Sequence, residues 1–231
     1  MRDVLTIIAA AAVTLGMPSA ALANDASHPT VVELYQSQGC SSCPPAIANI
    51  NAIAARPDVL ALTFAVTYWD QLGWKDTFAR PEFTRRQWDF AHGQGRGGVA
   101  TPQTIINGRV ITNGGDRGQL ITAIRAADRG AAGPAIRASA GKVTVGGGSA
   151  LRPATIWLVR YDPRAIDVPI RAGENGGRTI THRNVVRSLT KLGEWTGGAT
   201  TVAAPGGQPA LRSAILVQSG TGGPIIAAAR I

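Results

Sequence analysis

Apolar positions in the first part of the chain follow two spacings in turn, and these predict a strand, a helix and a second strand. Residues 30–35 (TVVELY) are rich in β-branched side chains, which is typical of a strand. Residues 46–55 (AIANINAIAA) repeat apolar side chains at helical spacing, and the Arg56-Pro57-Asp58 stretch ends that helix. Residues 59–68 (VLALTFAVTY) are almost continuously apolar, as expected of a strand buried on both faces. Together these segments predict a βαβ unit.

The next segments predict helix, hairpin and helix. Residues 69–98 are polar and aromatic, with apolar side chains at helical intervals, which indicates one helix or two short ones. Residues 103–113 (QTIINGRVITN) predict a β-hairpin, because Asn107-Gly108 fills the two central positions of a type I′ turn. Asp116 is placed to cap a final helix over residues 119–129.

The second half of the chain has a different pattern. After residues 130–134 (GAAGP), which are typical of a linker, short alternating segments are separated by Gly, Pro and Asn, without a good helix. This pattern predicts a mostly antiparallel β domain, sandwich-like or barrel-like. We therefore expect a signal peptide at residues 1–23, an α/β domain at 28–132 and a β-rich domain at 135–231. The alternating segments are Ile136–Val145, Ala154–Tyr161, Ala165–Arg171, Arg178–Ser188, Ser213–Gln218 and Pro224–Arg230.

The first residues have the pattern of an export signal. Residues 4–15 are apolar, and Ala21-Leu22-Ala23 supplies a small-x-small cleavage site. The apolar run is shorter than the roughly 20 residues that span a bilayer, and no later segment is apolar for long enough. We therefore expect no integral membrane segment after signal removal, and a periplasmic or secreted mature protein.

The formal net charge of the chain is +9, and most of it comes from dispersed arginines. There is no run of basic residues and no basic–aromatic pattern of the kind that binds nucleic acid. We expect no nucleic-acid partner, and the oligomeric state stays open.

Both cysteines of the chain, Cys40 and Cys43, lie in the stretch QGCSSCPPA at residues 38–46. Outside the cytoplasm such a pair is oxidised. A disulfide across two residues closes a very short loop, so it stabilises a fold far less than a long-range bridge does. The spacing therefore favours redox chemistry over a purely structural disulfide. The pair would itself be the redox group, and no other cofactor and no metal are expected.

In this chemistry Cys40 is the nucleophile, because N–H groups at the start of a helix stabilise a thiolate, and Cys43 resolves the mixed disulfide. Pro44 and Pro45 leave two alternatives for the helix. If Cys40 caps it, the prolines remove bonds within its first turn and a half. If the helix begins near Cys43 or Pro44, the prolines fit, but Cys40 lies in the preceding loop and receives less help.

The predicted order β-α-β-α-β-β-α, with C-x-x-C after the first strand and Thr101-Pro102 before the hairpin, resembles the thioredoxin fold. The resemblance implies an α/β thioredoxin-like N-terminal domain in which Pro102 is cis and faces the disulfide. Four strings look like a bacterial secreted family catalogued as domain of unknown function twelve-twenty-three. This family has no established activity, so the resemblance bears on the fold more than on the function. The strings are VVELYQSQGCSSCPPA, YWDQLGWKDTFARPEFTRRQ, TPQTIINGR and RAGENGGRTITHRNVV.

Ligands meet an open βαβ sheet at the carboxyl ends of its strands. Cys40 follows the first strand, Tyr68, Trp69 and Asp70 follow the second, and Thr101-Pro102 precedes the hairpin. We expect these groups to converge at one edge and to bind a protein or small molecule that carries a thiol or a disulfide.

Other ionisable groups leave alternatives open. Glu33 would be either a buried proton-transfer carboxylate for the thiols or a partly exposed acid at a strand edge. Glu174 and His182 have no partners at a recognisable spacing, so no catalytic constellation is expected in the second half. His92 is the histidine in reach of the cysteines for a metal site, and a closed zinc site needs four ligands.

The leading interpretation is an exported thiol–disulfide oxidoreductase-like protein that exchanges disulfides through Cys40 and Cys43, with the substrate and the direction of electron flow undetermined. The alternative is a non-catalytic partner-binding module of the cell envelope, in which the C-x-x-C is structural or vestigial. A third hypothesis is a Cu(I) carrier, because two thiolates are the soft ligands that Cu(I) prefers.

Overall fold

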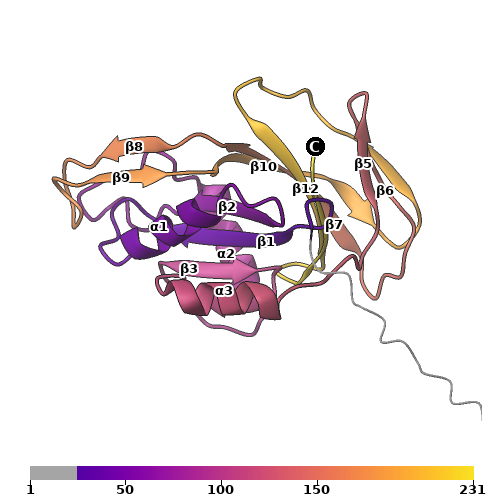
Figure 1. Ribbon diagram of the computed structural model, residues 1–231, viewed down its shortest axis with the longest axis horizontal. Helices are drawn as coiled ribbons and strands as arrows, with labels where there is room; N and C mark the ends of the chain where they lie inside the picture. The colour runs from indigo at the N-terminus through magenta and orange to yellow at the C-terminus, as the bar shows by residue number, and fades with distance from the viewer. Residues whose placement is uncertain (1–24) are drawn as a thin grey trace, which may run out of the picture.

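The computed structural model describes residues 25–231, in which three short helices and thirteen strands are found (Figure 1). The predicted signal peptide, residues 1–23, lies outside the described residues. Within the described part, no helix is long and apolar enough to cross a membrane. The first half contains β1 (Thr30–Gln36), α1 (Pro44–Ile53), β2 (Val59–Ala65), α2 (Pro81–Gly93), β3 (Gln103–Ile106), β4 (Val110–Thr112) and α3 (Arg117–Ala126). The second half contains β5 (Ile136–Ser139), β6 (Lys142–Val145), β7 (Ala154–Asp162), β8 (Ile166–Pro169), β9 (Thr179–His182), β10 (Val185–Trp195), β11 (Thr200–Ala203), β12 (Arg212–Ser219) and β13 (Ile225–Arg230).

One mixed sheet of eight strands runs through both halves of the chain, in the order β13-β12-β7-β10-β2-β1-β3-β4. The prediction of an α/β thioredoxin-like domain followed by a sandwich-like β domain is therefore wrong. The fold is mostly β, and its three short helices pack on a sheet to which both halves contribute. Two smaller sheets complete it: the order is β11-β6-β5 in the one, and β8 pairs with β9 in the other.

The junction between the halves is the parallel pairing of β2 with β10, at Thr63 and Val185. The N–H of Thr63 donates a hydrogen bond of 3.0 Å to the carbonyl oxygen of Asn184, and the Asn184 side chain donates one of 2.8 Å to the carbonyl oxygen of Ala61. All seven residues of β2 are buried, so this strand needs a neighbour on each side as well as cover on each face. The C-terminal half supplies the second neighbour.

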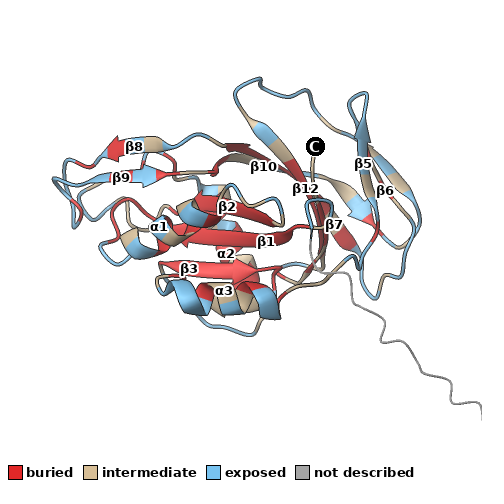
Figure 2. Cartoon of the chain, in the orientation of Figure 1, coloured by how far each residue is buried: buried red, intermediate tan, exposed pale blue. Residues whose placement is uncertain are grey.

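The central strands are buried (Figure 2), and their two faces have separate cores. Val32 and Leu34 of β1 pack in a core with α1, α3 and the β8–β9 hairpin. Val31 and Tyr35, which point to the opposite face, pack in a core with α2 and with strands of the second half. The alternation of side chains along β1 therefore decides which residues share a face with the cysteines, since both cysteines belong to the first core.

The β8–β9 hairpin extends along α1, as Figure 1 shows. The side chain of Asn51 in α1 donates a hydrogen bond of 2.7 Å to the carbonyl oxygen of Thr181 and accepts one of 3.0 Å from the N–H of Arg183. The connection between the two strands, residues 170–178 (here the β8–β9 turn), reaches beyond the start of α1. It thereby brings the second half of the chain to the cysteine pair.

Candidate functional site

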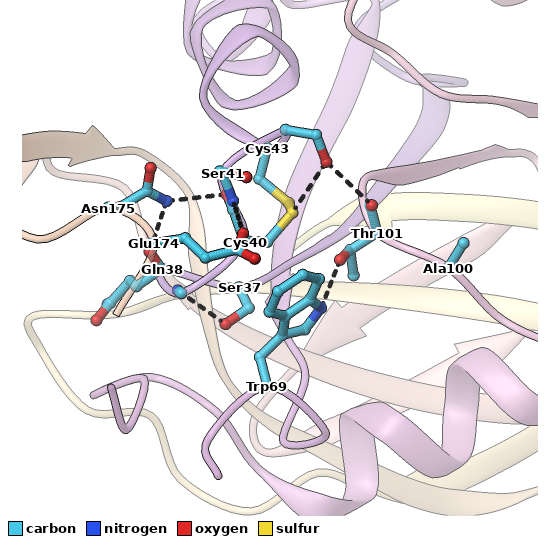
Figure 3. Close-up of a disulfide and its surroundings, with 12 residues drawn as sticks. Ser37, Gln38, Cys40, Ser41, Cys43, Trp69, Ala100, Thr101, Glu174 and Asn175 are labelled. Carbon is cyan, nitrogen blue, oxygen red and sulfur yellow. Dashed lines mark hydrogen bonds between the residues drawn. A yellow bond between two sulfur atoms is a disulfide. The ribbon is translucent and has the colours of Figure 1, made fainter. Parts of the chain in front are cut away.

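Cys40 and Cys43 form a disulfide in the loop between β1 and α1, with their Cα atoms 5.4 Å apart (Figure 3). Residues 37–43, here the CxxC loop, turn sharply: the N–H of Cys40 bonds to the carbonyl oxygen of Ser37, and the N–H of Cys43 bonds to that of Cys40, each at 3.1 Å. This loop follows β1 directly, so the disulfide lies at the carboxyl end of a central strand.

Helix α1 begins at Pro44, and Cys43 is its N-cap. Of the two alternatives for the prolines, the structure has the second: Pro44 and Pro45 occupy the first two helical positions, and Cys40 lies in the loop before the helix. Proline suits these positions because their N–H groups have no partner within a helix. The consequence is that the first two positions of α1 offer no N–H group to the side chain of Cys43.

Both cysteines have no exposed surface, although Ser41 and Ser42 between them are exposed. The hydroxyl of Ser42 lies 3.3 Å from Sγ of Cys40 and donates a hydrogen bond of 3.4 Å to the carbonyl oxygen of Thr101. Both sulfurs are therefore shielded from solvent, and the side chain of the exposed Ser42 lies next to that of Cys40.

The Thr101–Pro102 peptide bond is cis. Thr101 accepts a hydrogen bond of 2.7 Å at Oγ1 from the indole Nε1 of Trp69 (Figure 3). Trp69 also packs against Gly39 of the CxxC loop, where an added Cβ would lie 3.7 Å from Cβ of the tryptophan. The structure thus places Trp69 in contact with Thr101 on one side and with the CxxC loop on the other.

Tyr68 and Asp70 lie beside this group but make different contacts. The hydroxyl of Tyr68 donates to Oε1 of Gln87 in α2 at 3.3 Å, and burial raises the pKa of this tyrosine. Asp70 accepts a hydrogen bond of 3.1 Å from the N–H of Asp76 and so shapes the segment between β2 and α2, residues 66–80, here the Trp69 loop. No hydrogen bond joins either side chain to the CxxC loop in the described residues.

Asp76 is a buried carboxylate that the sequence analysis did not single out. It accepts a hydrogen bond of 2.7 Å from the N–H of Gln38 and one of 2.8 Å from the N–H of Phe78. Burial raises its pKa to about 6, against the lowering effect of these hydrogen bonds. The carboxylate joins the Trp69 loop to the start of the CxxC loop, and no local pattern in the sequence indicates this partnership.

The β8–β9 turn supplies two further residues that the sequence analysis did not connect to the site. Oε2 of Glu174 accepts a hydrogen bond of 3.0 Å from the N–H of Ser41. The buried side-chain amide of Asn175 donates to the carbonyl oxygens of Gln38 and Cys40, both at 2.9 Å (Figure 3). Asn175 lies between polar and glycine residues in RAGENGGR, which is typical of a turn but gives no sign of what the turn contacts.

Glu33 is neither a proton-transfer group for the thiols nor a partly exposed acid at a strand edge. It is fully buried on the sheet face opposite the disulfide, where Arg86 of α2 binds both of its carboxylate oxygens, at 2.7 and 2.8 Å. The hydroxyl of Tyr35 donates a third hydrogen bond to it at 2.7 Å. The side chain therefore belongs to a buried ion pair and is not placed to exchange protons with the cysteines.

The histidines do not join the cysteines. His92 lies at the end of α2 against Trp88, with ring centroids 5.4 Å apart. His182 is buried against Phe78, neither of its ring nitrogens has a hydrogen-bond partner, and burial lowers its pKa to about 4. Among residues 25–231 no group of three or more His, Cys, Asp or Glu side chains is arranged to hold a metal ion.

The profile of a protein family described as "Protein of unknown function (DUF1223)" matches residues 31–218. A crystal structure of a protein from Agrobacterium tumefaciens is 30% identical over 87% of this chain and 93% of that chain, with a TM-score of 0.71. HBP35 of Porphyromonas gingivalis is 11% identical over 89% of this chain and 75% of that chain, with a TM-score of 0.58, a likeness that concerns the fold alone. Among curated proteins no match was found.

Proposed function

The chain belongs to the DUF1223 family of proteins of unknown function, and within this family we propose that it exchanges thiols and disulfides through Cys40 and Cys43. The proposed setting is the periplasm or the cell exterior, in keeping with the oxidised state of the pair. The proposed substrate is a protein or a small molecule that carries a thiol or a disulfide.

The proposal rests on the position of the disulfide and on the residues around it. It closes a loop of two residues, which contributes little to the stability of a fold of this size. It also lies at the end of a central strand, beneath exposed serines and beside Trp69 and Thr101. A backbone carbonyl at Thr101 and an indole ring are suited to holding an extended chain next to the sulfurs.

The proposed exchange needs no reagent other than the substrate and the Cys40–Cys43 pair. A substrate thiolate attacks Sγ of Cys40, an S–S bond forms between them, and the Cys40–Cys43 bond breaks with Cys43 leaving as a thiolate. A second substrate thiolate then attacks the substrate sulfur of this mixed disulfide, and Cys40 leaves as the second thiolate. The substrate loses two electrons to the protein as its disulfide forms. In the reverse direction the Cys40 thiolate attacks a substrate disulfide, and Cys43 resolves the mixed disulfide.

Ser42 would take part in both the oxidation and the reduction of a substrate. Its hydroxyl lies 3.3 Å from Sγ of Cys40, within reach of donating a hydrogen bond to a thiolate there. The same hydroxyl contacts the carbonyl oxygen of Thr101, so a substrate backbone that pairs with Thr101 displaces it. Rotation of one exposed side chain therefore opens the path to the sulfur.

The test is the reduction potential of the pair together with trapping of substrates. We expect a potential between about −270 and −120 mV, the range of thiol–disulfide exchange proteins. The Cys43→Ser variant should accumulate mixed disulfides on Cys40 in cell-envelope extracts, and Cys40→Ser/Cys43→Ser is the matched control. A potential below about −300 mV, which is typical of structural disulfides, together with no trapped partner would contradict the proposal.

A binding module with a structural disulfide is the second candidate, and the complete burial of both cysteines favours it. In that case replacing both cysteines would leave partner binding intact. The potential separates the two candidates, because a structural role places no requirement on reversible reduction.

A further inference from the structure

The β8–β9 turn brings one charged side chain to the CxxC loop. The carboxylate of Glu174 bonds to the N–H of Ser41, which is next to Cys40 in the chain. Among the described residues no other charged side chain has a hydrogen bond to residues 40–43. Hydrogen bonding from Ser41 holds the pKa of Glu174 below its usual value, so the carboxylate is ionised at neutral pH.

The position of this charge is fixed by its neighbour. Asn175 donates hydrogen bonds to two carbonyl oxygens of the CxxC loop, and the guanidinium of Arg178 in the same turn donates to Oδ1 of Asn175 at 3.1 Å. No ion pair of the described residues includes Glu174. The carboxylate therefore lies at the exposed surface, bonded to the residue next to Cys40 and in no ion pair of the described residues.

A second contact joins the Trp69 loop to the β8–β9 turn. Gly73 and Gly173 face each other across the Trp69 loop and the β8–β9 turn, and a Cβ added at Gly73 would lie 3.5 Å from Cα of Gly173. Figure 3 shows Glu174 and Trp69 both next to the CxxC loop. A partner that approaches Sγ of Cys40 from solvent passes close to the negative charge.

We propose that Glu174 sets the charge preference of the exchange at Cys40, favouring thiols and disulfides that carry positive charge beside the reacting sulfur. This inference rests on the proposed function and names the class of substrate that the same site prefers, for example cysteines flanked by Lys or Arg. The attacking group is itself a thiolate, so the carboxylate opposes its approach, and a nearby cation on the partner offsets that repulsion.

The experiment measures rate constants for reduction of the disulfide by three small thiols of different charge. They are cysteamine with an ammonium group, neutral 2-mercaptoethanol, and glutathione with a net negative charge. Released protein thiols are alkylated and counted by mass. Glu174→Gln keeps an oxygen that can accept from Ser41, Glu174→Lys reverses the charge, and Glu194→Gln is the matched control, an exposed carboxylate on β10 that pairs with Lys191 at 2.7 Å.

In Glu174→Gln we expect the ratio of the glutathione to the cysteamine rate constant to rise about fivefold at low ionic strength, from two units of charge difference acting across roughly 8 Å of water-like medium. Glu174→Lys should raise it further, and Glu194→Gln should leave it unchanged. Screening in about 1 M salt should remove most of the effect. Because each thiol is compared with itself across variants, its intrinsic reactivity cancels.

Two negative results have different meanings. If none of the three thiols reduces the wild-type protein, the proposed function is wrong, and the charge preference is wrong with it. If all three reduce it and Glu174→Gln changes the three rates by the same factor, exchange stands and the charge preference is wrong. A merely structural role of the turn would produce that second result, since loosening the loop acts on every thiol alike.

Discussion

The side-chain nitrogen Nδ2 of Asn175 donates a hydrogen bond of 2.9 Å to the carbonyl oxygen of Cys40, a residue 135 positions earlier in the chain. The same nitrogen donates at the same distance to the carbonyl oxygen of Gln38. The conformation of the CxxC loop is therefore held in part by the second half of the protein.

Asn175→Ala should destabilise the protein by about 1–3 kcal/mol, because the carbonyl oxygen of Gln38 loses its donor and that of Cys40 keeps only the N–H of Cys43. The same change should speed reduction of the disulfide by any thiol, since residues 38–40 lose their anchor. Urea unfolding and reduction kinetics measure the two effects. Gln208→Ala, at an exposed position, is the control. Equal stability of Asn175→Ala and wild type would show that the anchor is not needed.

Pro45→Ala restores an N–H at the second position of α1, where the N-cap residue is Cys43. An N–H there can bond to the leaving thiolate of Cys43, so the dithiol form is stabilised and the reduction potential should rise by about 10–20 mV. Equilibration with glutathione buffers measures it. Pro81→Ala is the control, because it restores an N–H at the start of α2, a helix that does not follow the cysteines. A lowered potential in Pro45→Ala would contradict this account of the prolines.

His182 should make the protein sensitive to acid. Burial lowers its pKa from 6.5 to about 4, so the unfolded chain takes up a proton at higher pH than the folded one. Its contribution to stability is therefore complete above about pH 6.5 and is lost as the pH falls toward 4, by up to ~3 kcal/mol. His182→Leu should remove this dependence, and His92→Gln should keep it.

Asp76 has the opposite effect on the pH dependence of stability over part of the same pH range. Its pKa is raised to about 6, so its contribution to stability is present below its unfolded value of 3.8 and is lost as the pH rises through 6. For this reason the His182 prediction concerns the difference between the unfolding free energies of His182→Leu and wild type, measured by urea at each pH. A difference that stays constant from pH 7 to 4 would refute it.

Arg86→Met should cost about 3–5 kcal/mol, because Glu33 is left buried without its partner. The double variant Glu33→Leu/Arg86→Met should recover part of that loss, which distinguishes the ion pair from simple loss of packing. The reduction potential of the double variant should equal that of wild type, since the pair lies on the sheet face away from the disulfide. A shifted potential would mean that Glu33 acts on the cysteines after all.

Local signals in the sequence predict most elements of the first half. The run TVVELY lies within β1, and Asn107 and Gly108 have the positive φ values, 46° and 64°, that the predicted turn requires. Asp116 caps α3 by accepting from the N–H of Gln119 at 2.7 Å. Each of these features depends on residues a few positions apart, so a single sequence is sufficient to find it.

The pairing of β2 with β10 could not be predicted in the same way. It depends on Asn184 and Val185 meeting Thr63, and neither side has a pattern that names the other. For this reason the prediction of the fold class is wrong. For the same reason the sequence does not indicate that Glu174 and Asn175 contact the CxxC loop. Arg86 is a different case. It lies three residues after Phe83 and four before Phe90, on the apolar face of α2, and this spacing could have identified a buried charge.

The three hydrogen bonds that join Glu174 and Asn175 to the CxxC loop also bear on the order in which the protein folds. Protein chains are synthesised from the N-terminus, and earlier segments begin to fold first. Cys40 and Cys43 therefore emerge well before residues 170–178 exist to restrain the loop around them. Oxidation of the two thiols can take place while the loop is still open, and arrival of the β8–β9 turn then closes it. The order of these residues along the chain therefore allows the disulfide to form before the loop is closed.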